Sequence, residues 1–374
     1  MNKKKILFTA SIAKHILRFH LPYLEWFQQQ GFETHVACAG DEKIPFTDHQ
    51  WNVPFIRSPF SLGHVKAYKE LKKIIELNNY ELINCHTPMA SLVTRRAAAR
   101  SRQNGTKVLY TAHGFHFYNG ASMINWLTYY PIELYATKWA DAIITINNED
   151  FERIKSKGSP KTDYYIIPGI GVNGRRFSPV STEEKLTLRE KKGFAPDDFL
   201  LVYAAEFIDR KNHKFIIESV PEIIKSAPDI KFLFCGRGEL KEEMEALVNK
   251  MGINDYVKFL GFRDDIEEIF KVSDIGISSS RQEGLPINLV EVMMCGLPVL
   301  ATVERGHKEI IVPGENGFMF GQGNTQELVK YLTILYNDEN LRKAFGSRSI
   351  TIAANFEIKN SLSEMAKIYK KYLS

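Results

Sequence analysis

The sequence predicts an α/β protein made of two doubly wound parallel sheets. The chain has 374 residues with 44% hydrophobic content, which is enough for large cores and by length favours two domains over one. Short apolar or β-branched runs alternate with helical patterns in both halves, as in parallel α/β units. A polar, poorly periodic stretch at about residues 172–198 separates the two series.

The elements of the first half follow this alternation. Residues 15–31 predict a helix closed by Gly31, and Pro22 is expected to kink or divide it. The predicted strands are residues 4–10, 34–39, 82–86, 107–113, 142–147 and 164–168.

The second half restarts the pattern after a linker expected near residues 174–195. Its predicted strands are residues 199–206, 231–236, 257–262, 275–280 and 297–302, with helical segments such as 241–252 between them. We therefore expect an N-terminal domain at 1–175 and a C-terminal domain at 176–355, with a helix at 356–374 that packs back on the first domain.

Composition excludes several classes of protein. The net charge is only +5 with 25% charged residues, so bulk charge does not indicate a nucleic-acid binder. No apolar run approaches the length of a membrane span, and Lys14 and His15 interrupt the short run near the start, which argues against a signal peptide. Four widely spaced cysteines without metal-ligand spacing predict reduced core residues in a cytoplasmic protein.

The stretch from 278 to 302 holds two carboxylates in apolar surroundings. Pro286 fits a helix start, and Gly296 with Pro298 fits its end. Glu291 lies on this mostly buried helix and should therefore meet a polar partner, whereas Glu283 precedes the helix in a loop. The alternative is a structural carboxylate that caps its own loop. The helix residues expected in the core are Leu289, Val290, Val292, Met293 and Met294.

Open parallel sheets bind ligands beyond the carboxyl ends of their strands, so we expect a site in a cleft between two facing domains. The turn after the first strand has no closely spaced glycines, and no P-loop lysine motif is present. Phosphate would then be held by helix N-termini and basic side chains. Polar or glycine-rich positions follow the strands at 86, 113, 169–173, 206–211, 236–239, 262–263 and 278–284.

Five motifs in register resemble the retaining glycosyltransferases of family 4, which have the GT-B fold. They are "YTAHGFHFY", "PGIGVN", "DRKNH", "EGLPINLVE" with its Glu-x7-Glu spacing, and "PGENGFMF". The match extends over nearly the whole chain. "HLPYLEWFQQQG" and "HTPMAS" are most similar to the bacterial capsule and exopolysaccharide branch.

The resemblance implies separate roles in the donor site. Glu291 would accept hydrogen bonds from the ribose, and Glu283 would lie near the transferred sugar. Arg210 and Lys211 would hold the diphosphate, because preplaced cations stabilise the charge that grows on the leaving group. The family's Gly-Arg opening of this loop is Ala205-Glu206 here, so Arg210 is expected to replace the missing arginine. Otherwise "DRKNH" is a solvated helix start.

Further residues follow from the same resemblance. His113 would contact the donor sugar near the reacting carbon. No metal is expected, because no His, Asp or Glu cluster has ligand spacing and no Asp-x-Asp ends a strand; Asp264 and Asp265 look like a helix start. The remaining donor-binding assignments are the N–H groups of Gly284 and Leu285, with Glu206, Gly236, Phe262, Arg263 and Asn316.

The implied function is transfer of a sugar from a nucleoside-diphosphate sugar, with UDP as the expected nucleotide, to a polyprenyl-diphosphate-linked saccharide. The transfer would retain the anomeric configuration, without a side-chain nucleophile. Two alternatives stay open: a sugar-nucleotide epimerase of similar fold, and a non-catalytic nucleotide-sugar-binding subunit.

A basic run in the first half suggests where a lipid-linked acceptor is reached. Arg95, Arg96 and Arg100 occur with no acidic residue among them, and Trp126 begins an aromatic stretch. Such residues suit a protein docked on the inner face of the cell membrane, where anionic lipid attracts basic side chains. The alternatives are a solvated charged face and ordinary aromatic core.

Overall fold

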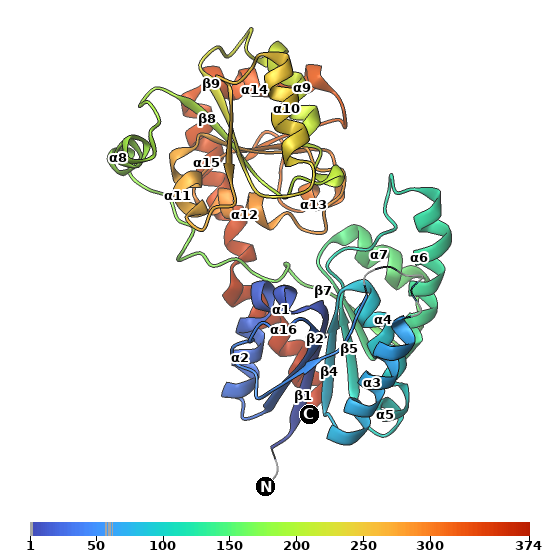
Figure 1. Cartoon of the computed structure of the whole chain (residues 1–374). Coiled ribbons are helices and arrows are strands. Elements are labelled where there is room, and N and C mark those ends of the chain that lie inside the picture. Colours follow the sequence, from blue (N-terminus) through green and yellow to red (C-terminus); the bar gives the residue numbers. More distant parts are fainter. Residues whose placement is uncertain (1–2, 57, 59–60, 62) are drawn as a thin grey trace. The chain divides into compact units, whose positions relative to one another are not determined.

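The computed structural model describes residues 3–56, 58, 61 and 63–374. It divides the chain into two compact units, which we call unit 1 (1–171 and 358–374) and unit 2 (172–357). Each unit holds one parallel sheet, as the alternating pattern predicts. The predicted α/β class with two doubly wound domains is confirmed (Figure 1).

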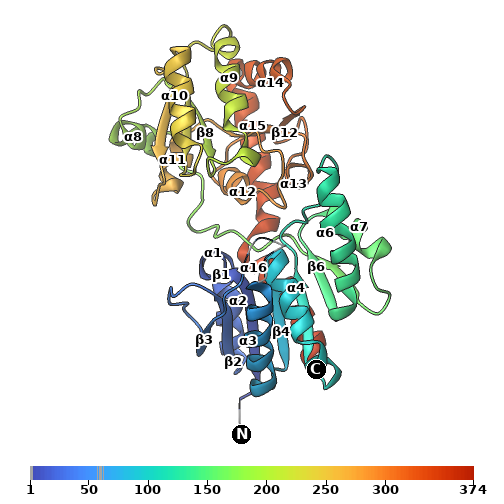
Figure 2. The same cartoon turned by 45° about the vertical axis from the view of Figure 1, so that its right-hand side comes forward.

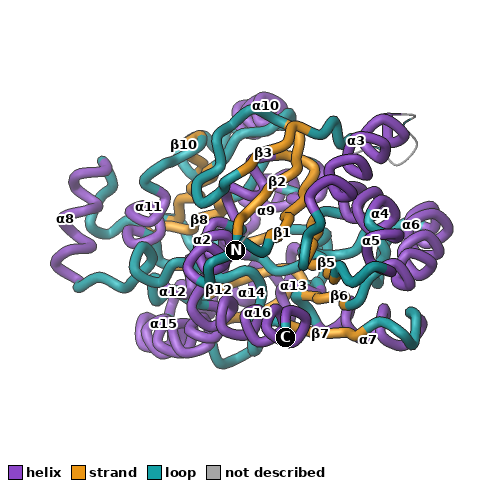
Figure 3. The backbone as a smooth tube through the Cα atoms, turned by 90° about the horizontal axis from the view of Figure 1, so that it is seen from below, coloured by secondary structure: helices purple, strands orange, loops and turns teal. Residues whose placement is uncertain are grey.

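Unit 1 contains a seven-stranded sheet in the order β3-β2-β1-β4-β5-β6-β7. Figure 3 shows α3 to α6 on one side of the strands and α2 with α16 on the other. Its strands are β1 (Lys5–Ile12), β2 (Glu33–Ala39), β3 (His49–Asn52), β4 (Leu82–His86), β5 (Lys107–Thr111), β6 (Ala142–Thr145) and β7 (Asp163–Ile166). Its helices are α1 (Ala13–Phe19), α2 (Leu21–Gln29), α3 (Gly63–Asn78), α4 (Pro88–Ala97), α5 (Ala99–Gln103), α6 (Met123–Ala136), η1 (Thr137–Trp139), α7 (Asn148–Lys157) and α16 (Ile358–Leu373).

Unit 2 contains a six-stranded sheet in the order β10-β9-β8-β11-β12-β13 (Figure 2). Its strands are β8 (Phe199–Ala204), β9 (Ile230–Cys235), β10 (Val257–Gly261), β11 (Ile275–Ser278), β12 (Val299–Thr302) and β13 (Gly317–Phe320). Its helices are α8 (Thr182–Lys192), η2 (Asp209–Lys211), α9 (His213–Ile223), α10 (Lys241–Met251), α11 (Ile266–Val272), α12 (Ile287–Met294), α13 (Arg305–Lys308), α14 (Thr325–Asn337), α15 (Glu339–Ala353) and η3 (Ala354–Phe356).

Local sequence accounts for the helix that positions Glu291. Pro286 precedes α12 as its N-cap, Gly296 follows it with φ 82°, and the five apolar residues expected in the core are all buried. The predicted division at Pro22 is also confirmed, because α1 ends at Phe19 and α2 begins at Leu21 with the proline in its first turn.

The expected linker near 174–195 is wrong, because α8 occupies most of it. The Ser181 hydroxyl accepts a hydrogen bond from the N–H of Glu184 at the start of the helix, and Gly193 ends it in the left-handed conformation. Lys185 and Arg189 each lie 2.7 Å from a carboxylate oxygen of Asp274. Ion pairs therefore anchor this helix in place of a strong apolar face, and apolar periodicity could not reveal it.

The C-terminal helix α16 belongs to unit 1 and packs against α2. The Tyr369 ring lies 4.7 Å from that of Phe27 between centroids, and its hydroxyl accepts a 2.6 Å hydrogen bond from Asn84 on β4. The last helix thus completes the core of the first unit.

Candidate active site

The central feature of unit 2 is a buried ion pair between Lys211 and Glu283. The two residues follow β8 and β11, which are neighbours in the sheet, so their loops meet at its carboxyl edge. Lys211 Nζ donates a hydrogen bond to Glu283 Oε1, and Arg210 Nη1 lies 3.7 Å from Oε2. Burial raises the pKa of Glu283, but Lys211 and Arg210 outweigh it and hold the pKa below its ordinary value. Glu283 is therefore charged.

Hydrogen bonds to the backbone fix the loop that carries the two cations. The Tyr203 hydroxyl donates to the Lys211 carbonyl at 2.7 Å, and the Ser279 hydroxyl donates to the Asn212 carbonyl at 2.8 Å. Asn212 has φ 52°, a left-handed conformation that asparagine tolerates better than most residues. The cations are thus preorganised, and Arg210 is the more exposed of the two, with 44% of its side chain accessible against 11% for Lys211.

The turn after β12 adds groups that the sequence analysis missed. Arg305 Nε donates to the Glu283 carbonyl oxygen at 2.9 Å. Gly306 lies so close that an added Cβ would be 2.8 Å from the Glu283 Cβ, so this position requires glycine. The end of β12 was not among the strand ends expected to contribute to the site. The carboxyl-end rule would have found the turn.

Two buried ionisable groups in this turn have strongly shifted pKa values. Burial raises the pKa of Glu304 to about 7, although its carboxylate accepts a 2.8 Å hydrogen bond from the Gly306 N–H. Burial lowers the pKa of His307 to about 4, and its Nδ1 lies 2.7 Å from the Thr302 carbonyl. At neutral pH the histidine is therefore neutral, whereas Glu304 is close to half protonated.

The helix residue Glu291 is only partly buried, whereas a buried carboxylate was expected. It lies on α12 between the buried Val290 and Val292. Gly284 and the buried Leu285 form the turn between Glu283 and this helix. A carboxylate on the accessible side of an apolar helix suits contact with a ligand better than a role in the core.

The remaining donor-side residues lie on the loops after β9 and β10. Phe262 is 58% exposed, and the Arg237 guanidinium lies 4.2 Å from its ring centroid, which makes a flat cationic surface that the sequence did not reveal. Arg263 forms two hydrogen bonds to Asp265 and is thereby neutralised. Gly236 is required by close packing, because an added Cβ would lie 1.9 Å from the Ala205 carbonyl oxygen. Glu206 is exposed.

Asn316 does not fit its expected contact with the donor. Its side chain is fully buried, with Oδ1 accepting from the Val312 N–H at 2.8 Å and Nδ2 donating to the Ile310 carbonyl at 3.0 Å. Both groups of the amide are hydrogen-bonded to the backbone of the turn before β13. The expected direct contact between Asn316 and the donor is therefore wrong.

In unit 1, four histidines gather at the carboxyl ends of β1, β4 and β5. His113 Nε2 lies 3.3 Å from His86 Nδ1, and the rings of His20 and His86 stack with centroids 3.7 Å apart. His15 packs edge-on to His113 at 4.8 Å. Burial, with a smaller contribution from His15, lowers the pKa of His113 well below its ordinary value. The imidazole is neutral at physiological pH.

The structure corrects the expectation that no metal-ligand cluster exists. Nitrogen atoms of His15, His20 and His113 all lie within 4.8 Å of one another. The sequence does not reveal it, because His113 is distant in the chain from the other two.

The basic run at residues 95–100 is partly internal. Arg95 has no exposed surface; its Nη1 lies 2.7 Å from Glu133 Oε1, and its guanidinium lies 4.4 Å from the Tyr110 ring centroid. Its expected place on a membrane-facing surface is therefore wrong. Arg96 and Arg100 are exposed, and Trp126 is partly buried.

Solved structures share this two-unit architecture. Anabaena Alr3699/HepE in complex with UDP-glucose aligns with a TM-score of 0.79 at 20% identity, covering 98% of this chain and 99% of that one. At this identity the likeness shows the fold alone. Two doubly wound parallel domains with a charged loop cluster at the sheet edge place the chain in the GT-B class.

Sequence relatives narrow the class to a family. The profile of glycosyl transferases group 1 matches residues 184–351, and that of the glycosyl transferase 4-like domain matches 5–147. Putative glycosyltransferase EpsD of Bacillus subtilis (strain 168) is 42% identical over 99% of this chain and 97% of its own length. The chain thus belongs to the group 1, or family 4, glycosyltransferases, which retain anomeric configuration.

A more distant relative carries a specific name. The UDP-Gal:alpha-D-GlcNAc-diphosphoundecaprenol alpha-1,3-galactosyltransferase of Escherichia coli is 25% identical over 95% of this chain and 93% of its own length. Among the described residues, no helix is long and apolar enough to cross a membrane.

Proposed function

We propose that the chain transfers a sugar from a UDP-sugar to a saccharide linked to polyprenyl diphosphate during exopolysaccharide synthesis. The observation that carries the proposal is the cluster of Arg210, Lys211 and Glu283 at the carboxyl edge of the unit 2 sheet. UDP is supported by the HepE complex and by the name of the E. coli relative, and the lipid-linked acceptor by that name alone.

The chemistry follows from charge. As the glycosidic bond breaks, negative charge grows on the departing diphosphate, and a preorganised cation stabilises it more in the transition state than in the ground state. Arg210 is exposed enough to contact the diphosphate directly, while Lys211 also forms an ion pair with Glu283. Glu291 binds the ribose, His113 acts on the donor sugar, and the diphosphate oxygen takes the acceptor proton on the same face.

The acceptor side is supported by the surface of α6. Three residues of this helix expose about 70% of their surface: Met123, Ile124 and Leu127, at 70%, 69% and 71%. Exposed cations lie at Lys138, which directly follows α6 in η1, at Arg96 on α4, which packs against α6, and at Arg100 on α5. An apolar ridge beside basic side chains suits reversible binding to anionic membranes, to which each such cation contributes about 1 kcal/mol.

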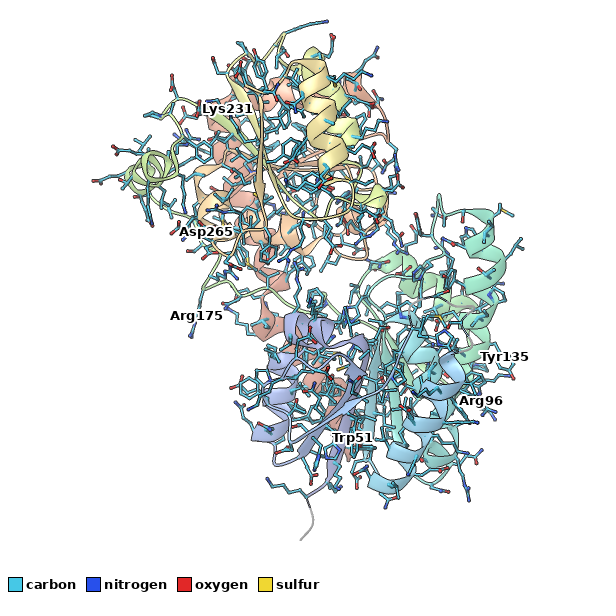
Figure 4. The ribbon with its side chains drawn as sticks, viewed as in Figure 1. Trp51, Arg96, Tyr135, Arg175, Lys231 and Asp265 are labelled. Carbon is cyan, nitrogen blue, oxygen red and sulfur yellow. The ribbon has the colours of Figure 1, made fainter. Side chains whose placement is uncertain are left out.

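A pocket of about 590 Å³ lies against the second half of α6 and is suited to an apolar chain. Arg96 and Tyr135, labelled in Figure 4, both contribute to its wall. Its lining residues are His64, Val65, Tyr68, Leu92, Val93, Arg96, Pro131, Ile132, Tyr135 and Trp139. Aromatic and aliphatic walls with one cation at the side suit a lipid tail whose charged head stays outside.

Transfer is tested by incubating the protein with a panel of labelled nucleotide sugars and a total lipid extract. We expect label in the lipid fraction with one UDP-sugar. Epimerised donor would indicate an epimerase, and binding without either product would indicate a non-catalytic subunit. Either of those results overturns the proposal.

Membrane docking is tested by co-sedimentation with anionic vesicles at low and high salt. Binding should appear at low salt, fade as salt rises, and be lost when Arg96 and Arg100 are both changed to Glu. The control is the double change Lys250→Glu and Lys258→Glu on unit 2, which alters net charge equally at exposed positions. Equal loss in both variants would mean that only overall charge matters.

A further inference from the structure

The histidine cluster of unit 1 has the composition of a transition-metal site. His15 lies in α1, His20 lies between α1 and α2, and His113 follows β5, so three different segments each bring one imidazole. The ligand atoms of these three residues lie within 4.8 Å of one another. A zinc ion with Zn–N bonds of about 2.0–2.1 Å needs its ligands closer than this, so binding has to draw the three rings together.

The surroundings of the rings favour a metal. A metal ion needs ring nitrogens whose lone pairs are not already used by the protein. Among the described residues, Nε2 of His20 is buried without a hydrogen-bond partner, and so is Nε2 of His86. His20 is only 2% exposed.

A second histidine group in the same unit shows what a less suitable cluster looks like. Glu33, His35 and His49 also place ligand atoms within 4.8 Å. There, however, Nδ1 of His35 lies 2.7 Å from the Tyr80 hydroxyl and Nε2 lies 2.8 Å from Glu33, so both ring nitrogens are occupied. A metal would have to break both of those bonds.

We propose that His15, His20 and His113 bind a divalent transition-metal ion of the Zn²⁺ class, and that the bound ion removes the His113 imidazole from the reaction. His86 acts as a positioning residue, because its Nδ1 lies 3.3 Å from Nε2 of His113 and fixes that ring. The binding claim stands on the cluster alone, whereas the inhibition claim rests on the proposed function.

Binding is tested on the full, tag-free chain by Zn²⁺ calorimetry and by the visible absorption of Co²⁺. We expect one equivalent, with a Co²⁺ spectrum of tetrahedral intensity, and at least a tenfold weaker affinity in His15→Ala and in His20→Ala. The matched control is His49→Ala, an exposed histidine on β3, which should bind as the unmodified chain does.

The outcome that overturns the site is absence of binding, or binding that His15→Ala and His20→Ala leave intact. Loss in His49→Ala would move the site to the other group. Because His20 is buried, circular dichroism must show that its variant is folded; His15 is more accessible and gives an independent measurement.

Inhibition is tested by measuring sugar transfer at rising Zn²⁺ and then adding EDTA. We expect zinc to abolish activity and EDTA to restore it. In His15→Ala, with activity expressed relative to that variant's own metal-free rate, the Zn²⁺ concentration that halves activity should be at least tenfold higher. Metal binding without any transfer activity would refute the proposed function and keep the site. Transfer that is insensitive to bound zinc would refute the inhibition.

Discussion

The two clusters at the sheet edges solve the problem of burying polar groups in opposite ways. In unit 2, Glu283 is buried against Lys211 with Arg210 nearby, so opposite charges compensate one another. In unit 1, His20, His86 and His113 are packed together and made neutral by burial. The first arrangement is fixed and charged, and removing one member leaves a buried charge. The second is uncharged and can accept a cation.

The largest expected effect comes from breaking the charged cluster. Lys211→Ala removes the hydrogen-bonded partner of Glu283 and a cation beside the leaving group. Turnover should fall by roughly 100-fold or more, as for other preorganised transition-state donors. The fall is measured by steady-state kinetics with the UDP-sugar that the transfer assay identifies.

Lys214→Ala, an exposed lysine on α9, is the control and should change little. Arg210→Ala should also lower turnover, because it is the more exposed cation of the loop. Normal kinetics in Lys211→Ala would remove the charged cluster from the mechanism.

The next effect concerns Glu304 in the same unit. Burial raises the pKa of this carboxylate more than the neighbouring Arg305 lowers it. The pKa of Glu304 is raised from 4.5 to about 7, so between these values the folded protein holds a proton that the unfolded chain releases. Stability should therefore fall as pH rises from about 4.5 to 7, by about 3 kcal/mol in total. Glu304→Gln should lack this loss and be the more stable protein at pH 8.

Urea unfolding at several pH values measures that difference. Glu315→Gln, an exposed carboxylate in the next turn, provides the comparison and should leave the pH profile unchanged. If Glu304→Gln follows the unmodified protein at every pH, burial is not setting the protonation of this group.

A smaller effect is expected at Glu291. If its carboxylate accepts hydrogen bonds from the ribose, Glu291→Ala should weaken UDP binding by about 1.5–3 kcal/mol, the range for a hydrogen bond to a charged group. Calorimetric titration with UDP measures it, with the exposed Glu243→Ala on α10 as control. Unchanged affinity would assign the ribose to another residue.

The smallest expected effect tests the neutral cluster. Sugar transfer should survive excess EDTA, because Arg210 and Lys211 stabilise the leaving group. The transfer does not require a metal ion at the histidine site. Activity lost in EDTA and restored by magnesium or manganese would show that a metal takes part in the transfer.

The fold was largely predictable because apolar alternation marks buried parallel strands. The two strands that the prediction missed, β3 and β13, each have four residues and lie at sheet edges, and neither alternates buried with exposed residues. Helix α8 was missed because its anchors are ion pairs to Asp274, a residue distant in the chain.

The site was predictable residue by residue but not as a set of contacts. Motifs pointed to Lys211 and Glu283, yet only the fold reveals that they pair. Arg95 was expected on the surface because a run of basic residues in the sequence does not reveal its partner. In the fold it forms a buried ion pair with Glu133. His15 and His20 were not connected with His113 because their proximity depends on the order of strands in the sheet.

The placement of α16 has a consequence for how the protein is made. Its Tyr369 packs on Phe27 and accepts a hydrogen bond from Asn84, so segments made before and after unit 2 share one core. Domains generally fold in the order of their synthesis. Here the first unit stays incomplete while the ribosome makes the whole of the second, and its core closes only when α16 leaves the exit tunnel. Any nascent chain stalled before residue 358 therefore carries an unfinished first unit.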